Sequence, residues 1–333
     1  MNPSPEPLVS IVTPVHNEAE FLAECIESVL AQTYQNWEYT IVDNCSTDRS
    51  VDIARQYAAK DRRIRVSVNT QFLRAIQNFN RALRQISPAS KYCKIVLGDD
   101  WIFPECLERM VALGESHPSV GIVGAYALAG RQIELAGLPY PSDVVDGREI
   151  CRKHLLEKLY VFGTQNSVLY RADLVRKNDP FYNEANIHAD TEACFALLRT
   201  WDFGFIHQVL TYTRVRAGSL NSIATSLQTN LPAILHLLQT YGSDYLTPEE
   251  LDVSLRQHIS VYYRFLGKSL VLSRDKKFWD YHKKKLAECG IGFSPMRLAR
   301  GAFEAFWTAT LNPLQSIAKG VRVLRLRSKL LRH

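Results

Sequence analysis

The sequence predicts an α/β protein whose mainly parallel sheet is flanked by helices. Short apolar, β-branched segments alternate with amphipathic helical segments through the first two-thirds of the 333 residues, and short loops join them. Parallel strands need a crossover connection, usually a helix, so this alternation is typical of repeated strand–helix–strand units. From about residue 223 the pattern becomes helical, which predicts an α/β domain at residues 1–222 and a C-terminal helical extension at residues 223–333.

The expected elements follow in order from the N-terminus. Strands are expected at Leu8–Val15, Trp37–Val42, Ile64–Val68, Tyr92–Leu97, Val120–Leu128 and Phe203–Tyr212, because these runs are short, apolar and rich in β-branched or aromatic residues. Helices are expected at Phe21–Leu30, Arg49–Ala59, Phe72–Ile86, Pro104–Ser116 and His188–Thr200, and then at residues 225–241, 247–272 and 275–289. Within Phe72–Ile86, the spacing places Phe72 on the buried side together with Phe79 and Leu83. Tyr160–Tyr170 reads as a turn that leads into a strand.

Two adjacent carboxylates follow the strand at Tyr92–Leu97. The strand is expected to stop at Gly98, which places Asp99 and Asp100 where open α/β sheets bind ligands, at the carboxyl end of a strand. Two carboxylates this close repel each other unless a cation lies beside them, and oxygen ligands suit Mg²⁺ or Mn²⁺. The alternative is that Asp99 or Asp100 caps the helix that is expected to begin at Pro104.

The bulk composition is that of a globular protein. The chain is 46% hydrophobic and 22% charged, which excludes a disordered chain. Its seven cysteines are odd in number and contain no CxxC pair, which argues against a disulfide framework or a zinc site. The first ten residues lack the basic and apolar regions of a signal peptide, and no uncharged apolar run reaches about 18 residues. We therefore expect a cytoplasmic protein, with peripheral contact to the inner face of a membrane as an option.

The net charge of +6 gathers in the C-terminal region. Residues 290–333 contain eight Lys or Arg and one Glu, a net charge of +7, so the rest of the chain is nearly neutral. This distribution favours an anionic surface as partner and argues against nucleic acid. Aromatic and basic residues recur there at helical spacing, among them Phe303, Phe306, Trp307, Arg322, Arg325, Lys329 and Arg332. They predict a basic amphipathic helix on an anionic membrane; the alternative is a helix packed on the protein with its charges in water.

Five stretches, in this order, resemble the inverting family 2 glycosyltransferases, which have the GT-A (Rossmann-like) fold. They are Pro14–Ser50, the GDDWIFP block at residues 98–104, Gly163–Arg171, His188–Thr200 and TYTRVRAGSLN at residues 211–221. The resemblance implies a metal-dependent, inverting transfer of a sugar from a nucleotide-sugar donor, UDP- or dTDP-linked. The acceptor would be a hydroxyl of a glycan or lipid-linked molecule, in surface or exopolysaccharide biosynthesis.

The resemblance also implies where the donor nucleotide lies. The residues expected to form the floor under its base and ribose are Thr13, Pro14, Val15, Asn17 and Glu18. Asp43 would accept a hydrogen bond from the N3–H of a uracil or thymine base. The alternative role of Asp43 is that of a turn residue whose carboxylate bonds to the local backbone.

The diphosphate and its metal are expected at the acidic pair. The acidic motif of the family is often Asp-x-Asp, and here Leu97 stands in its first position, so Asp99 and Asp100 remain. Asp99 would contact the ribose side and Asp100 the metal, Mn²⁺ or Mg²⁺, or both would share the ion, which would neutralise the leaving nucleoside diphosphate. Arg214 and Arg216 stand where the family often has an Arg and a His on a loop over the diphosphate, and both suit phosphate contact. The alternative is a solvated surface pair.

An inverting transfer also requires a carboxylate that takes the proton of the acceptor hydroxyl. The family places this base in a Glu-Asp pair at the start of a helix, and this sequence has Ala189 and Asp190 there. Asp190 is the expected base and Glu192 a nearby substitute, while the alternative is that Asp190 caps the helix. The residues expected to border the sugar and the acceptor are Trp101, Gly163, Thr164 and Asn166.

Two other functions remain open from the sequence. A nucleotidyltransferase would need a basic, glycine-rich loop after the first strand, and residues 15–18 contain neither glycine nor Lys or Arg. A non-catalytic relative that binds a partner or a membrane through its tail is the other alternative, supported by Leu97 and Ala189 in the positions of two family acids.

Overall fold

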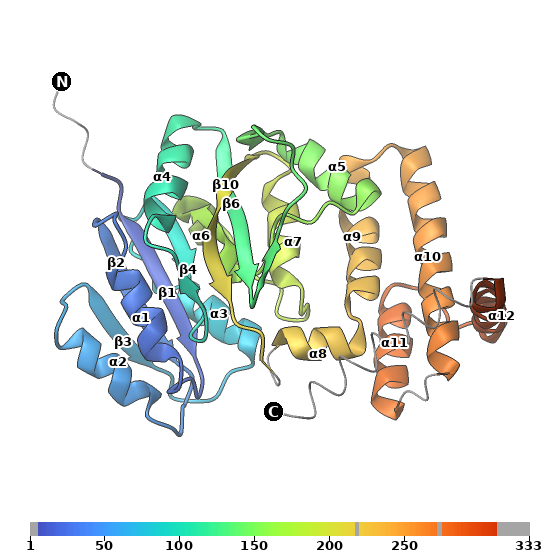
Figure 1. Cartoon of the computed structure of the whole chain (residues 1–333), viewed down its shortest axis with the longest axis horizontal. Helices are drawn as coiled ribbons and strands as arrows, with labels where there is room; N and C mark the ends of the chain where they lie inside the picture. Colours follow the sequence, from blue (N-terminus) through green and yellow to red (C-terminus); the bar gives the residue numbers. More distant parts are fainter. Residues whose placement is uncertain (1–5, 217–219, 272–274, 312–333) are drawn as a thin grey trace. The chain divides into compact units, whose positions relative to one another are not determined.

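The computed structural model describes residues 6–216, 220–271 and 275–311. The chain divides into two compact units, Met1–Ile223 and Ala224–His333. The first unit is an α/β sandwich built on one large sheet, and the second is helical (Figure 1).

The sheet of the first unit is mixed but mainly parallel. Its strands are β1 (Val9–Val15), β2 (Trp37–Asp43), β3 (Ile64–Val68), β4 (Tyr92–Ile95), β5 (Trp101–Ile102), β6 (Val120–Ala129), β7 (Gln132–Glu134), β8 (Val144–Val145), β9 (Val168–Arg171) and β10 (Asp202–Thr213). The main path has the order β3-β2-β1-β4-β9-β6-β10-β5. The β1–β2, β2–β3, β1–β4 and β6–β10 pairs are parallel, whereas β9 is antiparallel to both of its neighbours. The predicted fold class is confirmed.

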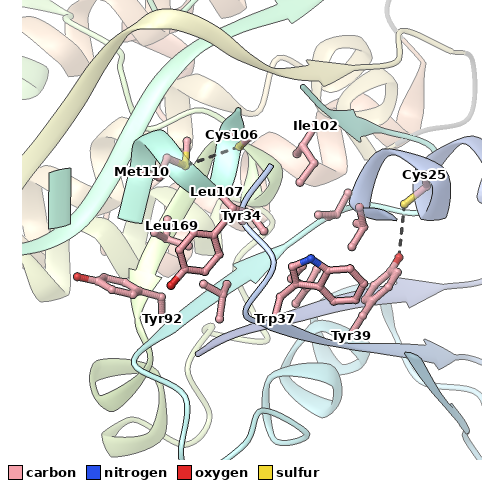
Figure 2. Packing of buried hydrophobic residues seen from close by; sticks show 14 of the residues in the cluster. Cys25, Tyr34, Trp37, Tyr39, Tyr92, Ile102, Cys106, Leu107, Met110 and Leu169 are labelled. Carbon is pink, nitrogen blue, oxygen red and sulfur yellow. Dashed lines mark hydrogen bonds between the residues drawn. The ribbon is translucent and has the colours of Figure 1, made fainter. Parts of the chain in front are cut away.

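Helices cover both faces of this sheet. They are α1 (Leu22–Leu30), α2 (Ser50–Ala58), α3 (Ala75–Leu83), α4 (Cys106–Ser116), α5 (Gly147–Glu157), α6 (Ala172–Lys177) and α7 (Ala189–Leu197). All seven residues of β1 are buried, as expected for a strand that is covered on both faces. Val9, Ile11 and Val15 share one hydrophobic core with residues of α1, α2 and α4 (Figure 2). The helix α3 packs against β1 and β2, and α6 packs against β4 and β9.

One expected helix begins later than its apolar spacing predicts. The helix α3 starts at Ala75, after Arg74, whose N–H donates to Oε1 of Gln77 at 3.0 Å and so closes the first turn. Phe72 therefore precedes the helix, and 62% of it is exposed. The prediction that Phe72 is buried is wrong, because helical spacing says nothing about a residue outside the helix.

The second unit is built from α9 (Asn230–Tyr245), α10 (Pro248–Val271), α11 (Lys276–Glu288) and α12 (Pro295–Leu311), and α8 (Leu220–Leu227) spans the division between the units. Its core gathers Leu235, Tyr262, Tyr263, Leu266, Phe278 and Leu286. Among the described residues, no helix combines the length and the apolar character needed to cross a bilayer. The basic residues Arg322, Arg325, Lys329 and Arg332 lie outside the described part of the chain.

Candidate active site

A cavity of about 260 Å³ opens at the carboxyl ends of β1 and β4. Its lining comes from the segments that follow β1, β2 and β4, from the start of α3, from the turn before β9 and from the segment after β10. Eight residues predicted from the sequence line it: Pro14, Val15, Glu18, Asp99, Asp100, Thr164, Arg214 and Arg216. Eight others do not: Thr13, Asn17, Asp43, Trp101, Gly163, Asn166, Asp190 and Glu192.

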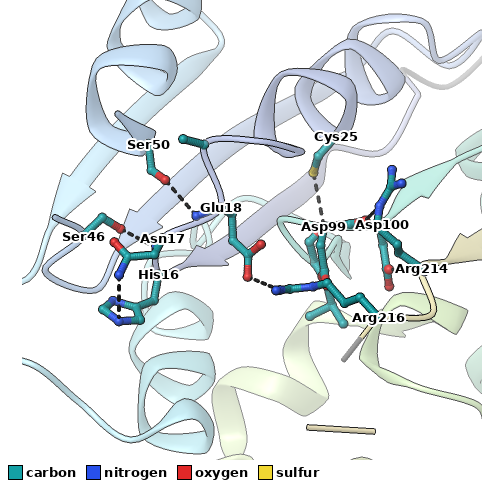
Figure 3. A network of polar contacts seen from close by, with 12 residues as sticks. His16, Asn17, Glu18, Cys25, Ser46, Ser50, Asp99, Asp100, Arg214 and Arg216 are labelled. Carbon is teal, nitrogen blue, oxygen red and sulfur yellow. Dashed lines mark hydrogen bonds and ion pairs between the residues drawn. The ribbon is translucent and has the colours of Figure 1, made fainter. Parts of the chain in front are cut away.

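The loop after β1 is fastened to the loop after β2 (Figure 3). Asn17 adopts a left-handed φ of 55°, which asparagine tolerates better than most residues. Its N–H donates to Ser46 Oγ at 2.9 Å, and its Oδ1 accepts from the N–H of Thr47 at 2.8 Å. The N–H of Glu18 donates to Ser50 Oγ at 2.9 Å. Through these hydrogen bonds Asn17 holds the loop in place, and the side chain of Glu18 lines the cavity.

Thr13 and Asp43 are buried, each directly before a residue that lines the cavity. The hydroxyl of Thr13 is fully buried and lies 2.8 Å from the hydroxyl of Tyr39. The Oδ2 of Asp43 accepts from the N–H of Ser46 at 3.0 Å, which is the local turn bond expected as its alternative role. Its Oδ1 is buried and has no hydrogen-bond partner among the described residues.

Asp100 presents an unpaired oxygen at the site. It is 2% exposed, and its Oδ1 accepts from the N–H of Arg214 at 2.8 Å, whereas its Oδ2 is buried without a partner in the described structure. Burial and, next, the charge of Asp99 raise the pKa of Asp100 well above its usual range. The helix α4 begins at Cys106, with β5 in between, so neither acid caps it and that alternative is wrong.

The two arginines are bound to carboxylates and backbone rather than to solvent (Figure 3). The Nε of Arg216 donates to Oδ2 of Asp99 at 2.6 Å, and its Nη2 donates to Oε1 of Glu18. The Nε of Arg214 donates to the carbonyl oxygen of Asp99 at 2.9 Å, and its Nη2 donates to Glu24. The alternative of a solvated surface pair is therefore wrong.

Arg216 neutralises this acidic cluster only in part. Burial and, next, the neighbouring charge of Asp99 raise the pKa of Glu18 to about 7, and Arg216 opposes that rise. The Oε2 of Glu18, like the Oδ2 of Asp100, is buried and has no hydrogen-bond partner among the described residues. Two oxygen atoms with unused acceptor capacity therefore remain at a site that already contains a guanidinium group.

Asp190 lies in the first turn of α7. Its Oδ1 accepts from the N–H of Thr191 at 2.7 Å, and burial raises its pKa to about 6. The charge of Asp190 contributes to raising the pKa of Tyr160, so the two side chains are neighbours. The hydroxyl of Tyr160 donates to the carbonyl of Gly163 at 2.8 Å, and the next residue, Thr164, lines the cavity. Asp190 thus adjoins the loop that forms one border of the cavity.

Glu192 has a different environment. It is 7% exposed, and its Oε2 accepts from the side-chain amides of Asn183 at 3.1 Å and Asn186 at 2.6 Å. A carboxylate held in this way fixes the segment that precedes α7. These contacts argue against Glu192 as a base, because a base must be free to exchange protons.

Three of the residues expected near the sugar do not line the cavity but are next in sequence to residues that do. The ring of Trp101 stacks on Tyr212, with centroids 3.5 Å apart and planes at 9°. The buried side-chain amide of Asn166 donates to the carbonyl of Tyr212 at 3.0 Å. Gly163 has a φ of +68°, and a Cβ there would lie 2.3 Å from Ser167 Oγ, so only glycine fits.

An aromatic wall was missed by the sequence analysis. Phe72 and Phe79 line the cavity, and the ring of Phe72 meets the ring of His16 edge-on, with centroids 5.0 Å apart. An exposed aromatic ring at a cavity offers a flat apolar surface for a planar ligand. The sequence gives only a weak signal for the later start of α3, because Arg74, the residue at its N-cap, is not of a favoured capping type.

Residues 10–177 match the family model described as "Glycosyl transferase family 2". The chain belongs to this family. The protein of Bacillus subtilis (strain 168) named "Putative glycosyltransferase EpsE" is 33% identical over 166 residues, which cover 47% of this chain and 59% of that protein. The chain therefore spans less than two-thirds of the length of this curated relative.

Two solved structures share the fold of this family 2 glycosyltransferase. S. aureus TarS (residues 1–349), in complex with UDP-GlcNAc, has a TM-score of 0.63 at 17% identity, over 89% of this chain and 88% of that one. The mannosyltransferase PcManGT from Pyrobaculum calidifontis, in complex with GDP-Man and Mn²⁺, has a TM-score of 0.53 at 13% identity, over 92% and 89%. At these identities the likeness shows a GT-A-like fold.

Proposed function

We propose that this family 2 member transfers a sugar, with inversion, from a UDP- or dTDP-linked donor to a hydroxyl of a glycan or lipid-linked acceptor, in the synthesis of a surface polysaccharide or exopolysaccharide. The observation that carries the proposal is a single cavity that combines an aromatic wall, two arginines and an acidic pair. Each of these features suits a part of a nucleoside diphosphate. The aromatic wall offers a surface for the base, the arginines offer positive charge to the phosphates, and the acidic pair can hold a metal cation beside the leaving group. The name of EpsE, a putative glycosyltransferase, and the UDP-GlcNAc in the complex of TarS support a nucleotide-sugar donor.

The nucleotide is proposed to lie across the floor formed by Pro14 and Val15, with its base against Phe72. Asp43 precedes Asn44, which lines the cavity, and its buried Oδ1 has no partner among the described residues, which supports its proposed hydrogen bond to the N3–H of the base. Arg214 and Arg216 are proposed to contact the diphosphate, with Arg216 exchanging its carboxylate partners for phosphate oxygens.

One feature of this site favours the binding of a divalent ion, and another opposes it. The buried, unpartnered oxygens of Asp100 and Glu18 are the hard donors that Mn²⁺ or Mg²⁺ prefers. However, among the described residues no three His, Cys, Asp or Glu side chains are grouped closely enough to hold an ion, and Arg216 bridges Glu18 and Asp99. Asp99 and Asp100 would hold the ion once Arg216 turns to the diphosphate. When bound, the ion supplies positive charge to the leaving phosphates.

Asp190 is proposed to accept the proton of the acceptor hydroxyl. The hydroxyl oxygen then forms a bond to the anomeric carbon, the bond from that carbon to the diphosphate oxygen breaks, and the nucleoside diphosphate leaves with the bonding electrons. Asp190 adjoins the border of the cavity at Gly163 and Thr164, where the sugar would lie, and Glu192 is engaged by two asparagines. We therefore prefer Asp190 to Glu192.

The proposal is tested with a panel of nucleotide sugars, each incubated with the chain and Mn²⁺ or Mg²⁺. Release of UDP or dTDP from one donor is the expected result. Release of pyrophosphate would assign a nucleotidyltransferase instead. No turnover, together with no thermal stabilisation by any nucleotide, would assign a non-catalytic binding protein.

Phe72→Ala is expected to weaken nucleotide binding about tenfold, because one face of the base loses its aromatic contact. The free energy of unfolding should change by no more than about 0.5 kcal/mol, since Phe72 is 62% exposed. Titration of UDP and dTDP followed by calorimetry measures the first effect and thermal melting the second. Ile133→Ala, at a similarly exposed apolar residue in β7, is the control. Equal affinity in both variants would remove Phe72 from the site.

Arg216→Gln is expected to weaken the binding of the donor and to strengthen the binding of the metal. The KM for the donor should rise about 10- to 100-fold because a charged phosphate contact is lost. The metal concentration for half-maximal activity should fall, because Arg216 no longer occupies the oxygens of Asp99 and Glu18. Arg84→Gln, which removes an exposed partner of Asp179, is the control. A KM that stays the same would show that Arg216 only braces the loop.

The rate of transfer is expected to depend on pH through Asp190. A base works when it is deprotonated, so with a pKa of about 6 the value of kcat/KM should rise up to about pH 6 and then level off. The stability of the fold is expected to change with pH in the opposite direction. The folded state binds the proton of Asp190 more tightly than the unfolded chain does. The free energy of unfolding contributed by Asp190 is therefore lost as the pH rises from 3.8 to about 6. A pH profile of initial rates checks the first expectation, and a flat profile would exclude Asp190 as the titrating base.

A further inference from the structure

A stripe of exposed apolar side chains runs along α12. Its members are Met296, Phe303, Phe306 and Trp307, with exposed fractions of 80%, 66%, 67% and 56%. At 100° per residue, these four positions fall within an arc of about 100° on one side of the helix. We call this surface the α12 stripe. When large apolar side chains gather on one exposed face, that face is more often an interaction surface than a surface that contacts only water.

The opposite side of α12 explains why the stripe faces outward. A Cβ at Gly301 would lie 2.3 Å from the carbonyl oxygen of Tyr263, and a Cβ at Gly267 would lie 2.2 Å from the N of Ala302. The two glycines therefore let α12 and α10 approach closely, backbone against backbone. This contact fixes which face of α12 is buried, so the aromatic residues of the stripe contribute little to the core of the second unit.

Two basic residues accompany the stripe on α12, and the sequence that contains it is basic. Arg297 and Arg300 stand on α12 itself, and its one acid, Glu304, already pairs with Arg264 at 3.1 Å and with Arg300 at 3.0 Å. The segment from residue 290 to residue 333 carries eight Lys or Arg and one Glu. An aromatic helix face that belongs to a stretch of sequence with a net charge of +7 is complementary to an apolar layer beneath negative charges.

We propose that the α12 stripe inserts into the interfacial layer of an anionic lipid bilayer and holds the chain on the membrane surface. Phe and Trp side chains are favoured at the boundary between headgroups and acyl chains, and nearby Lys and Arg are attracted by anionic lipid. A second copy of this chain is a poorer occupant, because each copy has a net charge of +7 in the sequence from residue 290 to residue 333, and like charges repel. The bilayer accepts both the aromatic residues and the positive charge.

The experiment is flotation of the full chain with vesicles of phosphatidylcholine, either alone or mixed with phosphatidylglycerol. The expected result is binding to the anionic vesicles, much weaker binding to the neutral ones, and loss of binding at high salt. The double variant Phe303→Ser, Phe306→Ser should reduce binding about tenfold or more, because two interfacial aromatic groups are lost. The control is Val253→Ser, Val261→Ser, which removes two exposed apolar residues (42% and 43%) from α10 of the same unit.

Three results would overturn the proposal. They are absence of binding to anionic vesicles, equal binding by the double variant and the parent chain, and a dimer of the parent that the double variant converts to a monomer. Thermal melting and donor hydrolysis in solution, measured on both variants, separate loss of membrane contact from loss of folding or of catalysis.

Discussion

Asp190→Asn is expected to lower kcat for sugar transfer by about 10²- to 10⁴-fold, the contribution that a positioned general base makes. Asparagine has the same shape and can keep the bond from the N–H of Thr191, so α7 should retain its start. The KM for the donor should change little, because Asp190 does not line the cavity. Single-turnover rates with a transferred sugar measure the loss of kcat directly.

Two matched variants make this expectation specific. Asp173→Asn changes a first-turn aspartate in α6 and should leave kcat unchanged. Glu192→Gln should lower the melting temperature, because its carboxylate holds two asparagine side chains, and should leave the chemistry in place. If Glu192→Gln abolishes turnover while Asp190→Asn retains it, the base is Glu192.

Asp100→Asn is expected to separate activity from stability. Turnover of the donor and its response to Mn²⁺ or Mg²⁺ should fall about 100-fold or more, because the carboxylate that would hold the ion beside the leaving diphosphate is lost. The free energy of unfolding near neutral pH should rise, since the fold holds this carboxylate at a raised pKa and is stabilised by its neutral replacement. Initial rates and denaturant unfolding, measured on the same preparation, test both effects.

The control for Asp100 is Asp52→Asn, an exposed aspartate in the first turn of α2. It should change neither quantity appreciably. An Asp100→Asn variant that is both less active and less stable would show that Asp100 serves the fold through the N–H of Arg214, and its proposed role at the leaving group would then fail.

The strands at the centre of the sheet were predictable because burial on both faces makes them continuous apolar runs. Expected and observed bounds agree within a residue or two for β1, β2 and β3. The helix α5 was missed although Asp146 accepts from the N–H of Glu149, a capping pattern visible in the sequence. The two-residue strands β5 and β8 carry too little periodicity to be read at all.

The candidate site was predictable where polar or charged residues come directly after a strand in the sequence, as Asp99 and Asp100 do. The contact of Arg216 with Glu18 joins residues 198 positions apart, and only the folded sheet brings them together. Phe72 was misplaced for the same reason: its exposure depends on where α3 begins and on the loop after β1. Register and loop packing, which residue types alone do not determine, decide these contacts.

Crystals of the chain grown with UDP and Mn²⁺ test most directly whether the cavity at the ends of β1 and β4 binds the nucleotide. The expected electron density shows the base against Phe72, the diphosphate against Arg216 turned away from Asp99, and the ion beside the free oxygen of Asp100. Nucleotide bound in another cavity, or Arg216 still bridging Glu18 and Asp99 beneath a bound diphosphate, would contradict the proposed site.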